Sequence, residues 1–146
     1  MSAHLISSQQ ASVRLVARMM FAAVFLPSGM GKLLSFDATA GFIASRGLPF
    51  AGLMAAGAVV VELVGSAALL AGWRTRWAAL TLLAFTLLAA LLFHDFWAAP
   101  AAQAMLQRQA FLKNVGIAGG LLLLAAVGAG RISLDHHREN ANSHLS

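Results

Sequence analysis

Residues 77–93, with the sequence WAALTLLAFTLLAALLF, carry no charge and decide the fold of this chain. The hydrocarbon core of a bilayer is ~30 Å thick and a helix rises about 1.5 Å per residue, so a spanning helix needs about 20 mostly apolar residues. With the residues on either side, the stretch extends to 76–97 and meets that length. We therefore predict a membrane-spanning helix over residues 76–97.

Three further apolar segments are long enough to span a bilayer. They are residues 13–34, 50–72 and 110–130. Of the 146 residues, 60% are hydrophobic and only 10% are charged, whereas a soluble domain has about 25% charged residues. The predicted fold class is all-α, an integral membrane four-helix bundle at residues 13–134, between a polar N-terminal tail at 1–12 and a disordered C-terminal tail at 135–146.

The segments between the predicted helices have the composition of connections. Residues 35–49 contain two charges, two glycines and a proline, which favours a loop. Residues 73–76 form a tight turn that leaves the second and third helices antiparallel. Pro100 ends the third helix because proline cannot continue the hydrogen-bond ladder, and the chain up to Arg108 is predicted to be a short connection.

The first apolar segment also has some features of a secretion signal. Ala38-Thr39-Ala40 has the small-x-small pattern that signal peptidase recognises. However, Arg18 interrupts the apolar run, and the run is longer than the core of a typical signal peptide. We therefore expect the segment to stay in the protein as a helix.

The basic residues are scattered at the ends of the predicted spans, and the formal net charge is +5. This spacing suits contact with lipid headgroups and does not form the basic patch of a nucleic-acid-binding protein. Four spans place both termini on one side of the membrane. The larger number of basic residues on that side favours both termini in the cytoplasm. The two sets are Arg14, Arg18, Arg74, Arg76, Arg131 and Arg138 on that side, and Lys32, Arg46, Arg108 and Lys113 on the other.

The sequence contains no cysteine. It therefore has no disulfide, no thiolate nucleophile and no iron–sulfur ligand, and any redox chemistry needs a bound cofactor or a partner chain. No metal site is predicted, since His94 and Asp95 are adjacent, point in different directions on a helix and lack a third ligand.

Of the residues in the predicted spans, Glu62 has the highest free-energy cost of insertion into the membrane, because it lies in the middle of the second apolar segment. A carboxylate near the bilayer midplane costs roughly 2.5 kcal/mol or more and usually faces the bundle interior. Arg18, one turn deeper than Arg14, is a candidate partner for an intramembrane ion pair. Glu62 could handle protons or bind a ligand, or it could be a structural group paired between helices, and both interpretations stay open.

A second group of polar and aromatic residues is expected at the membrane face opposite the termini. A histidine there can pass a proton near neutral pH, and aromatic rings can stack on a flat headgroup. The alternative is an aromatic belt with a polar end. Together with Glu62, which lies deeper in the membrane, these residues form a candidate polar cluster that could bind an aromatic headgroup: Lys32, His94, Asp95, Trp97, Lys113 and Asn114.

The chain resembles the DoxX family of small bacterial membrane proteins, from Arg14 to Asp135. Each matching piece is short, but their order and spacing together are specific. One difference is Ala129, where relatives often have proline. The pieces are Ser28-Gly29-Met30-Gly31-Lys32, Phe36 and Phe42, Gly47-Leu48-Pro49, Glu62 with Gly65, Gly72-Trp73-Arg74-Thr75-Arg76, His94-Asp95-Phe96-Trp97, Phe111-Leu112-Lys113-Asn114, and Gly130-Arg131-Ile132-Ser133-Leu134-Asp135.

The resemblance implies a multi-pass protein of the bacterial plasma (inner) membrane. Some members of the family are linked to quinone reduction as subunits of oxidoreductases, and others to oxidative-stress and thiol-handling complexes. The implied function is a quinone-interacting membrane subunit that receives electrons from a soluble redox partner, without evidence of autonomous catalysis and with no covalently bound cofactor. Homo-oligomers are compatible with the glycine-rich helix faces.

Two other functions remain open from the sequence. The chain could be a non-enzymatic scaffold that anchors a soluble enzyme through its cytoplasmic turn and tail. It could instead be a small-solute or proton carrier in which Glu62 is the titrating group.

Overall fold

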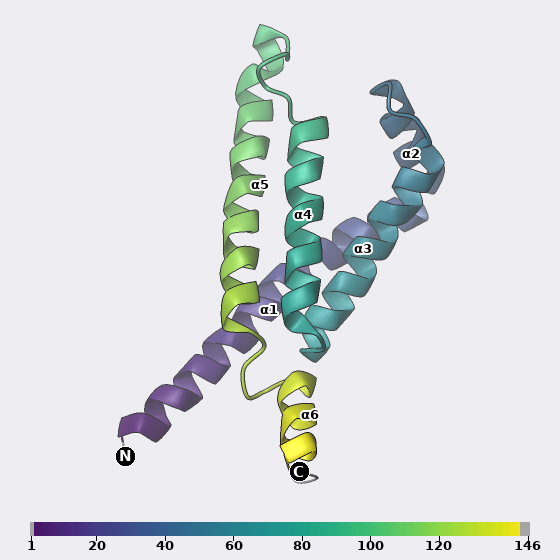
Figure 1. The fold of residues 1–146 in the computed structure, drawn as a ribbon. Helices are drawn as coiled ribbons and strands as arrows, with labels where there is room; N and C mark the ends of the chain where they lie inside the picture. The colour runs from purple at the N-terminus through teal and green to yellow at the C-terminus, as the bar shows by residue number, and fades with distance from the viewer. Residues whose placement is uncertain (1, 144–146) are drawn as a thin grey trace.

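A computed structural model describes residues 2–143, and all of its regular elements are helices (Figure 1). Residue 1 and residues 144–146, which belong to the predicted terminal tails, lie outside the described residues. The six helices are α1 (Ser2–Leu34), α2 (Phe36–Ser45), α3 (Ala51–Ala71), α4 (Thr75–Phe93), α5 (Ala101–Val127) and α6 (Leu134–Ser143).

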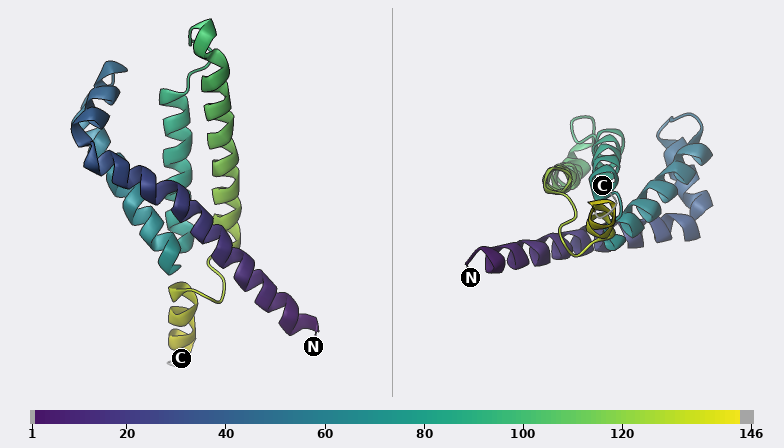
Figure 2. Two further views of the ribbon diagram at one scale, coloured as in Figure 1. Left: turned by 180° about the vertical axis from the view of Figure 1, so that it is seen from behind. Right: turned by 60° about the horizontal axis from the view of Figure 1, so that its bottom comes forward.

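Four of these helices are long and apolar enough to cross a membrane, which confirms the predicted all-α membrane fold. They are arranged as two pairs, with α1 packed along α3 and α4 packed along α5. The two pairs diverge from each other toward the end of the molecule opposite the termini (Figures 1 and 2). The spanning segments are Gln9–Leu34, Ala51–Ala71, Thr75–Phe93 and Ala101–Val127.

The apolar core lies where the two pairs meet, toward the end of the molecule that carries both termini. Phe25, Leu69, Leu82 and Leu121 from four different helices are buried there. Large apolar side chains on the outer faces, such as Leu123, are instead exposed, as expected of helices in contact with lipid tails. The two helix pairs are therefore packed together at the end that carries the termini and are separated at the opposite end.

Two segments predicted to be irregular are helical. The predicted loop at 35–49 contains α2, because its proline and its left-handed glycine come only after Ser45, and Ile43 can be buried against α3. The predicted disordered tail at 135–146 contains α6 as far as Ser143. The backbone N–H of Asp135, at the start of α6, donates to the carbonyl oxygen of Gly72 at 2.9 Å, so the segment is tied to the end of α3.

The helix limits also differ from the predicted ones at three places. α4 ends at Phe93, so His94 lies in the connection and not on the helix. α5 begins immediately after Pro100, because residues 101–110 are mostly good helix formers and proline is well tolerated just before a helix. α1 begins at Ser2 and therefore includes most of the predicted N-terminal tail.

Gly29 brings α1 close to α3. A β-carbon added at Gly29 would lie 2.9 Å from Leu63 Cδ2 and 3.0 Å from Glu62 Cβ, whereas one added at Gly31 meets nothing within 4 Å. We expect Gly29→Ala to lower the free energy of unfolding by about 1–3 kcal/mol, because it overpacks the contact. Gly31→Ala is the matched control and should be neutral or stabilising, because alanine favours a helix more than glycine does.

Thermal or SDS unfolding of the two variants in detergent micelles measures the difference. Equal stability of Gly29→Ala and Gly31→Ala would show that α1 does not pack on α3 through Gly29.

Candidate functional site

A cavity of about 660 Å³ lies between the diverging pairs of helices. Its size is within the range of small-molecule sites. Most of its lining is apolar, with Phe25, Val61, Phe85 and Ile117 among the side chains. Polar groups are gathered on two of its walls, one built by α1 and α3 and the other by the end of α4 and by α5.

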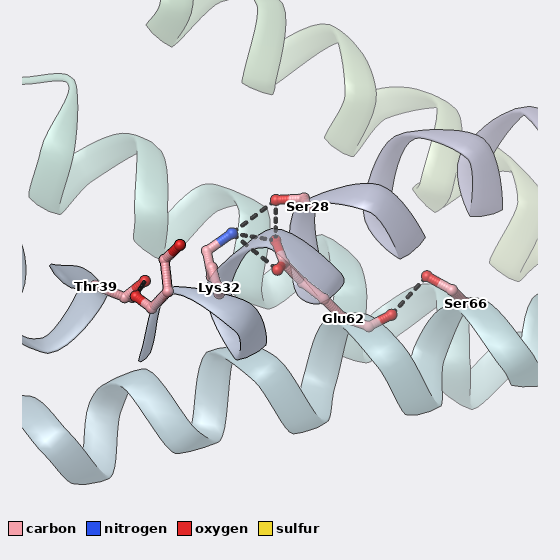
Figure 3. A network of polar contacts seen from close by, with 6 residues as sticks. Ser28, Lys32, Thr39, Glu62 and Ser66 are labelled. Atoms are coloured by element: carbon pink, nitrogen blue, oxygen red, sulfur yellow. Dashed lines mark hydrogen bonds and ion pairs between the residues drawn. The ribbon is translucent and has the colours of Figure 1, made fainter. Parts of the chain in front are cut away.

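The first wall carries an ion pair between the partly buried Lys32 of α1 and the buried Glu62 of α3 (Figure 3). Lys32 Nζ lies 2.8 Å from Glu62 Oε2 and 3.0 Å from Oε1. It also donates to Ser28 Oγ at 2.6 Å, and the Ser28 hydroxyl donates to Glu62 Oε1 at 3.0 Å. The three protons of the ammonium group therefore all have acceptors, and both carboxylate oxygens have donors.

Local sequence explains how this cluster forms on two helices. Ser28 and Lys32 are four residues apart, which places them on one face of α1. Gly29 lets that face approach α3 closely, and Glu62 is only 3% exposed. One turn farther along α3, the Ser66 hydroxyl donates to the backbone oxygen of Glu62 (Figure 3). A charged group at this depth is tolerated because it is paired and hydrogen-bonded.

The second wall carries His94, Gln107, Lys113 and Asn114. His94 Nδ1 lies 3.0 Å from Gln107 Oε1. With the amide oxygen turned toward the ring, Nδ1 is the donor and Nε2 of a neutral ring is an acceptor. His94 is therefore held by one nitrogen, and its other nitrogen is left for a ligand.

Two contacts join the two sides of the cavity at the end of the molecule opposite the termini. The rings of Phe42 on α2 and Phe93 on α4, which both line the cavity, have centroids 5.6 Å apart. Beside them, the guanidinium of Arg46 donates to Asp95 and to the carbonyl oxygen of Leu92. The segment after α2 is thereby linked to the end of α4.

The predicted ion pair between Arg18 and Glu62 does not form in the structure. Arg18 lies about four turns before Lys32 on α1, so it is near the opposite end of the bundle. Its guanidinium is buried beneath Gly72 and donates to the carbonyl oxygen of Ile132. Glu62 is instead paired with Lys32, which was predicted to lie in the same cluster but not to be the partner.

The structure brings five of the seven predicted cluster residues to one cavity. The other two lie outside its lining: Asp95 is paired with Arg46, and the Trp97 ring packs edge-to-face on Phe96 and Phe111. The five in the cavity are Lys32, Glu62, His94, Lys113 and Asn114.

Ser28 and Gln107 are site residues that the sequence did not predict. The i to i+4 spacing of Ser28 and Lys32 was a usable signal, because Glu62 needs a partner. Gln107 gave no such signal, because its segment was predicted to be a connection and its contact with His94 depends on α5 beginning at Ala101.

The stabilisation that comes from the contact between Arg46 and Asp95 depends on pH. The hydrogen bond from the Arg46 guanidinium lowers the pKa of Asp95 below its usual value, with a smaller contribution from its charge. Because the folded-state pKa is lowered, the stabilisation is present above the usual Asp pKa of about 4 and is lost as the pH falls through the lowered value.

We therefore expect Asp95→Asn to lower the thermal unfolding midpoint slightly at pH 7 and to leave it unchanged near pH 2 relative to the wild type. Arg46→Gln should lower the midpoint at pH 7 at least as much, because it removes the other partner and also the hydrogen bond to the carbonyl oxygen of Leu92. Unfolding scans of the three proteins at both pH values measure this. A difference that persists in acid would mean that Asp95 acts through something other than its charge.

Comparisons with known proteins agree on one family. The family model described as DoxX matches residues 13–95, which is more than half of the chain and includes Lys32, Glu62 and His94. No solved structure matches the chain.

Two curated relatives come from Escherichia coli (strain K12). The chain is 38% identical to inner membrane protein YqjF over 121 residues, which cover 83% of this chain and 88% of that protein. It is 37% identical to inner membrane protein YphA over 121 residues, which cover 83% of this chain and 86% of that protein. On the strength of the family match and of these two relatives, the chain belongs to the DoxX family.

Proposed function

We propose that this multi-pass membrane protein is a quinone-interacting subunit of a redox or oxidative-stress complex, with the quinone headgroup held in the cavity between the two helix pairs. The observation that carries the proposal is the composition of the cavity. It combines an apolar lining with the Lys32–Glu62 ion pair on one wall and, on the other, a His94 ring that is hydrogen-bonded through one nitrogen only.

The residues present fit the chemistry of a lipid quinone. A quinone supplies a flat ring with two carbonyl oxygens, which accepts electrons together with protons, and it carries an apolar tail. Phe85 and Ile117 offer apolar surface for the ring and the tail. Lys113 and Asn114 offer hydrogen-bond donors on the wall that also carries His94.

His94 is the residue best placed to hold or move a proton. Its Nδ1 is engaged with Gln107, so a proton can be exchanged at Nε2 without loss of the ring's orientation. The three N–H donors of Lys32 are all taken by Glu62 and Ser28. In this state the Lys32–Glu62 pair sets the charge distribution of the wall and offers no free donor to a ligand. The chain has no cysteine to hold an iron–sulfur cluster. We therefore include in the proposal a soluble redox partner that supplies the electrons.

We place the protein in the bacterial inner membrane with both termini in the cytoplasm. The curated relatives are named inner membrane proteins, and the larger group of basic residues lies on the side of the termini, as expected for cytoplasmic ends of spans. Homo-oligomers are compatible with this arrangement.

The test is to purify the protein in mild detergent, extract the bound lipid and measure quinone by chromatography. Wild type is compared with Glu62→Gln and His94→Ala. Gln103→Ala is the matched control, because this exposed residue lies on α5 outside the cavity lining. We expect quinone at a fixed ratio to protein in wild type and control, and its loss in both site variants while helicity is retained.

Absence of quinone from folded wild-type protein, together with no uptake of an added short-chain quinone, would overturn the proposal. A co-purified soluble enzyme without lipid ligand would then favour the scaffold. Proton flux in liposomes that disappears in Glu62→Gln would favour the carrier.

A further inference from the structure

A second cavity, of about 590 Å³, lies at the opposite end of the molecule, on the side of the termini. It is formed where α4 begins and α5 ends, together with the segment that leads into α6. Five of its lining residues are arginines, and one carboxylate accompanies them. The arginines are Arg14, Arg74, Arg76, Arg131 and Arg138, and the carboxylate is that of Asp135.

The carboxylate of Asp135 is already used by the backbone. Its Oδ1 accepts a hydrogen bond from the N–H of Arg74 at 2.6 Å, and its Oδ2 accepts one from the N–H of Thr75 at 2.9 Å. Asp135 therefore caps the N-terminus of α4, whose N–H groups and dipole favour a negative charge. Among the side chains that the structure describes, no ion pair joins a carboxylate to any of the five arginines.

Two glycines that line the cavity allow arginine side chains to pack closely against the backbone. A β-carbon added at Gly128 would lie 3.3 Å from Arg76 Nε, and one added at Gly130 would lie 3.0 Å from Arg14 Cδ. Arg14 Nη1 also donates to the carbonyl oxygen of Val127 at 3.1 Å. These cationic side chains are thus packed at one place, and among the described residues only the Asp135 carboxylate, which is hydrogen-bonded to the backbone, lines the cavity with them.

The cavity lies at the edge of the spanning segments. Val127, the last residue of the α5 span, lines it, and so does Trp77, which is near the start of the α4 span and is 69% exposed. Tryptophan and arginine at the ends of spans meet the headgroup region of a bilayer, where the phosphates lie. Basic pockets at this level bind anionic headgroups.

We propose that this cavity binds a phosphate group, either the phosphodiester of an anionic lipid headgroup or free phosphate. Arginine presents a planar set of N–H donors that matches phosphate oxygens in a bidentate manner. The ligand supplies negative charge to arginines that form no ion pair with a carboxylate of the described residues, and Asp135 keeps α6 and the start of α4 in place around it. This site is independent of the proposed quinone site, which lies at the other end of the bundle.

Native mass spectrometry of the detergent-purified protein tests the proposal by titration with phosphatidylglycerol, phosphatidylcholine and inorganic phosphate. The variants are Arg76→Gln and Arg131→Gln, two exposed side chains. Arg108→Gln is the matched control, because it removes one exposed positive charge from α5 outside both cavities. Circular dichroism verifies that each variant is folded.

We expect phosphatidylglycerol to bind more tightly than phosphatidylcholine, and each cavity variant to weaken this binding about fivefold. Arg108→Gln should bind as wild type does. Competition by millimolar inorganic phosphate would assign the site to a free anion, and lack of competition would assign it to a lipid. Equal binding of the two lipids without phosphate binding, or an equal loss in Arg108→Gln, would overturn the proposal.

Discussion

Replacing Lys32 with methionine is expected to lower the free energy of unfolding by about 3 kcal/mol, because it leaves a buried carboxylate without its cation. The Glu62 side chain is only 5% exposed, whereas that of Lys32 is 29% exposed. The single variants Lys32→Met and Glu62→Gln should therefore differ in how much stability they lose. Glu62→Gln leaves an ammonium group that still has Ser28 and partial access to solvent, so its cost should be smaller, about 1 kcal/mol.

The double variant Lys32→Met/Glu62→Gln separates pairing from packing. It contains neither charge, so it should be more stable than Lys32→Met alone, although it has lost the same lysine. SDS titration of the four proteins in mixed micelles gives the coupling energy between the two side chains. Additive losses would contradict the ion pair as the reason that Glu62 is tolerated in α3.

Replacing Gly72 with alanine is expected to cost about 3 kcal/mol, through two effects. Gly72 ends α3 with φ at 65°, a backbone conformation that costs an L-residue about 1–2 kcal/mol. An added β-carbon would also collide with Arg18 Nη1 and lie 2.5 Å from Ser133 Cβ. Arg18 would have to move, and it would lose its hydrogen bond to Ile132 inside the protein, at a cost of about 1–3 kcal/mol.

Gly47→Ala is the matched control for Gly72→Ala. Gly47 has a similar φ of 71°, but an added β-carbon there meets nothing within 4 Å. Only the conformational cost should appear in Gly47→Ala, so the difference between the two variants measures the displacement of Arg18 together with that of Ser133. Limited trypsin cleavage at Arg131 provides a second measurement, because displaced Arg18 no longer holds the segment before α6. Equal stability and equal cleavage of the two variants would show that Arg18 does not hold this segment.

Some features of the site could be predicted from individual residues. A carboxylate in the middle of an apolar segment needs a partner, so the position of Glu62 in the sequence is enough to single it out. Lys32, His94 and Lys113 were placed at one membrane face by the number and direction of the spans alone. Their convergence on one cavity agrees with that reasoning, because alternate spans fix which ends share a face.

Other features depended on contacts between distant segments. Arg18 and Lys32 both lie on α1, and the sequence allows either to be the partner of Glu62. Gly29 favours Lys32, because it lets α1 contact α3 at the level of Ser28 and Lys32. α2 forms because Ile43 can be buried against α3, and α6 is held because Asp135 caps α4. Local composition at these two segments is compatible with loops as well as with helices.

The sequence by itself determined the class of protein, the four spans and the charged residues whose transfer into the membrane carries a large free-energy cost. Hydrophobic length is a local property, and the cost of transferring a charge into hydrocarbon belongs to the residue itself. Only the tertiary structure decided which charges pair, which helices diverge and where the two cavities lie. Those outcomes depend on how closely two backbones approach, and that distance is set jointly by residues far apart in the chain, as Gly29 and Glu62 show.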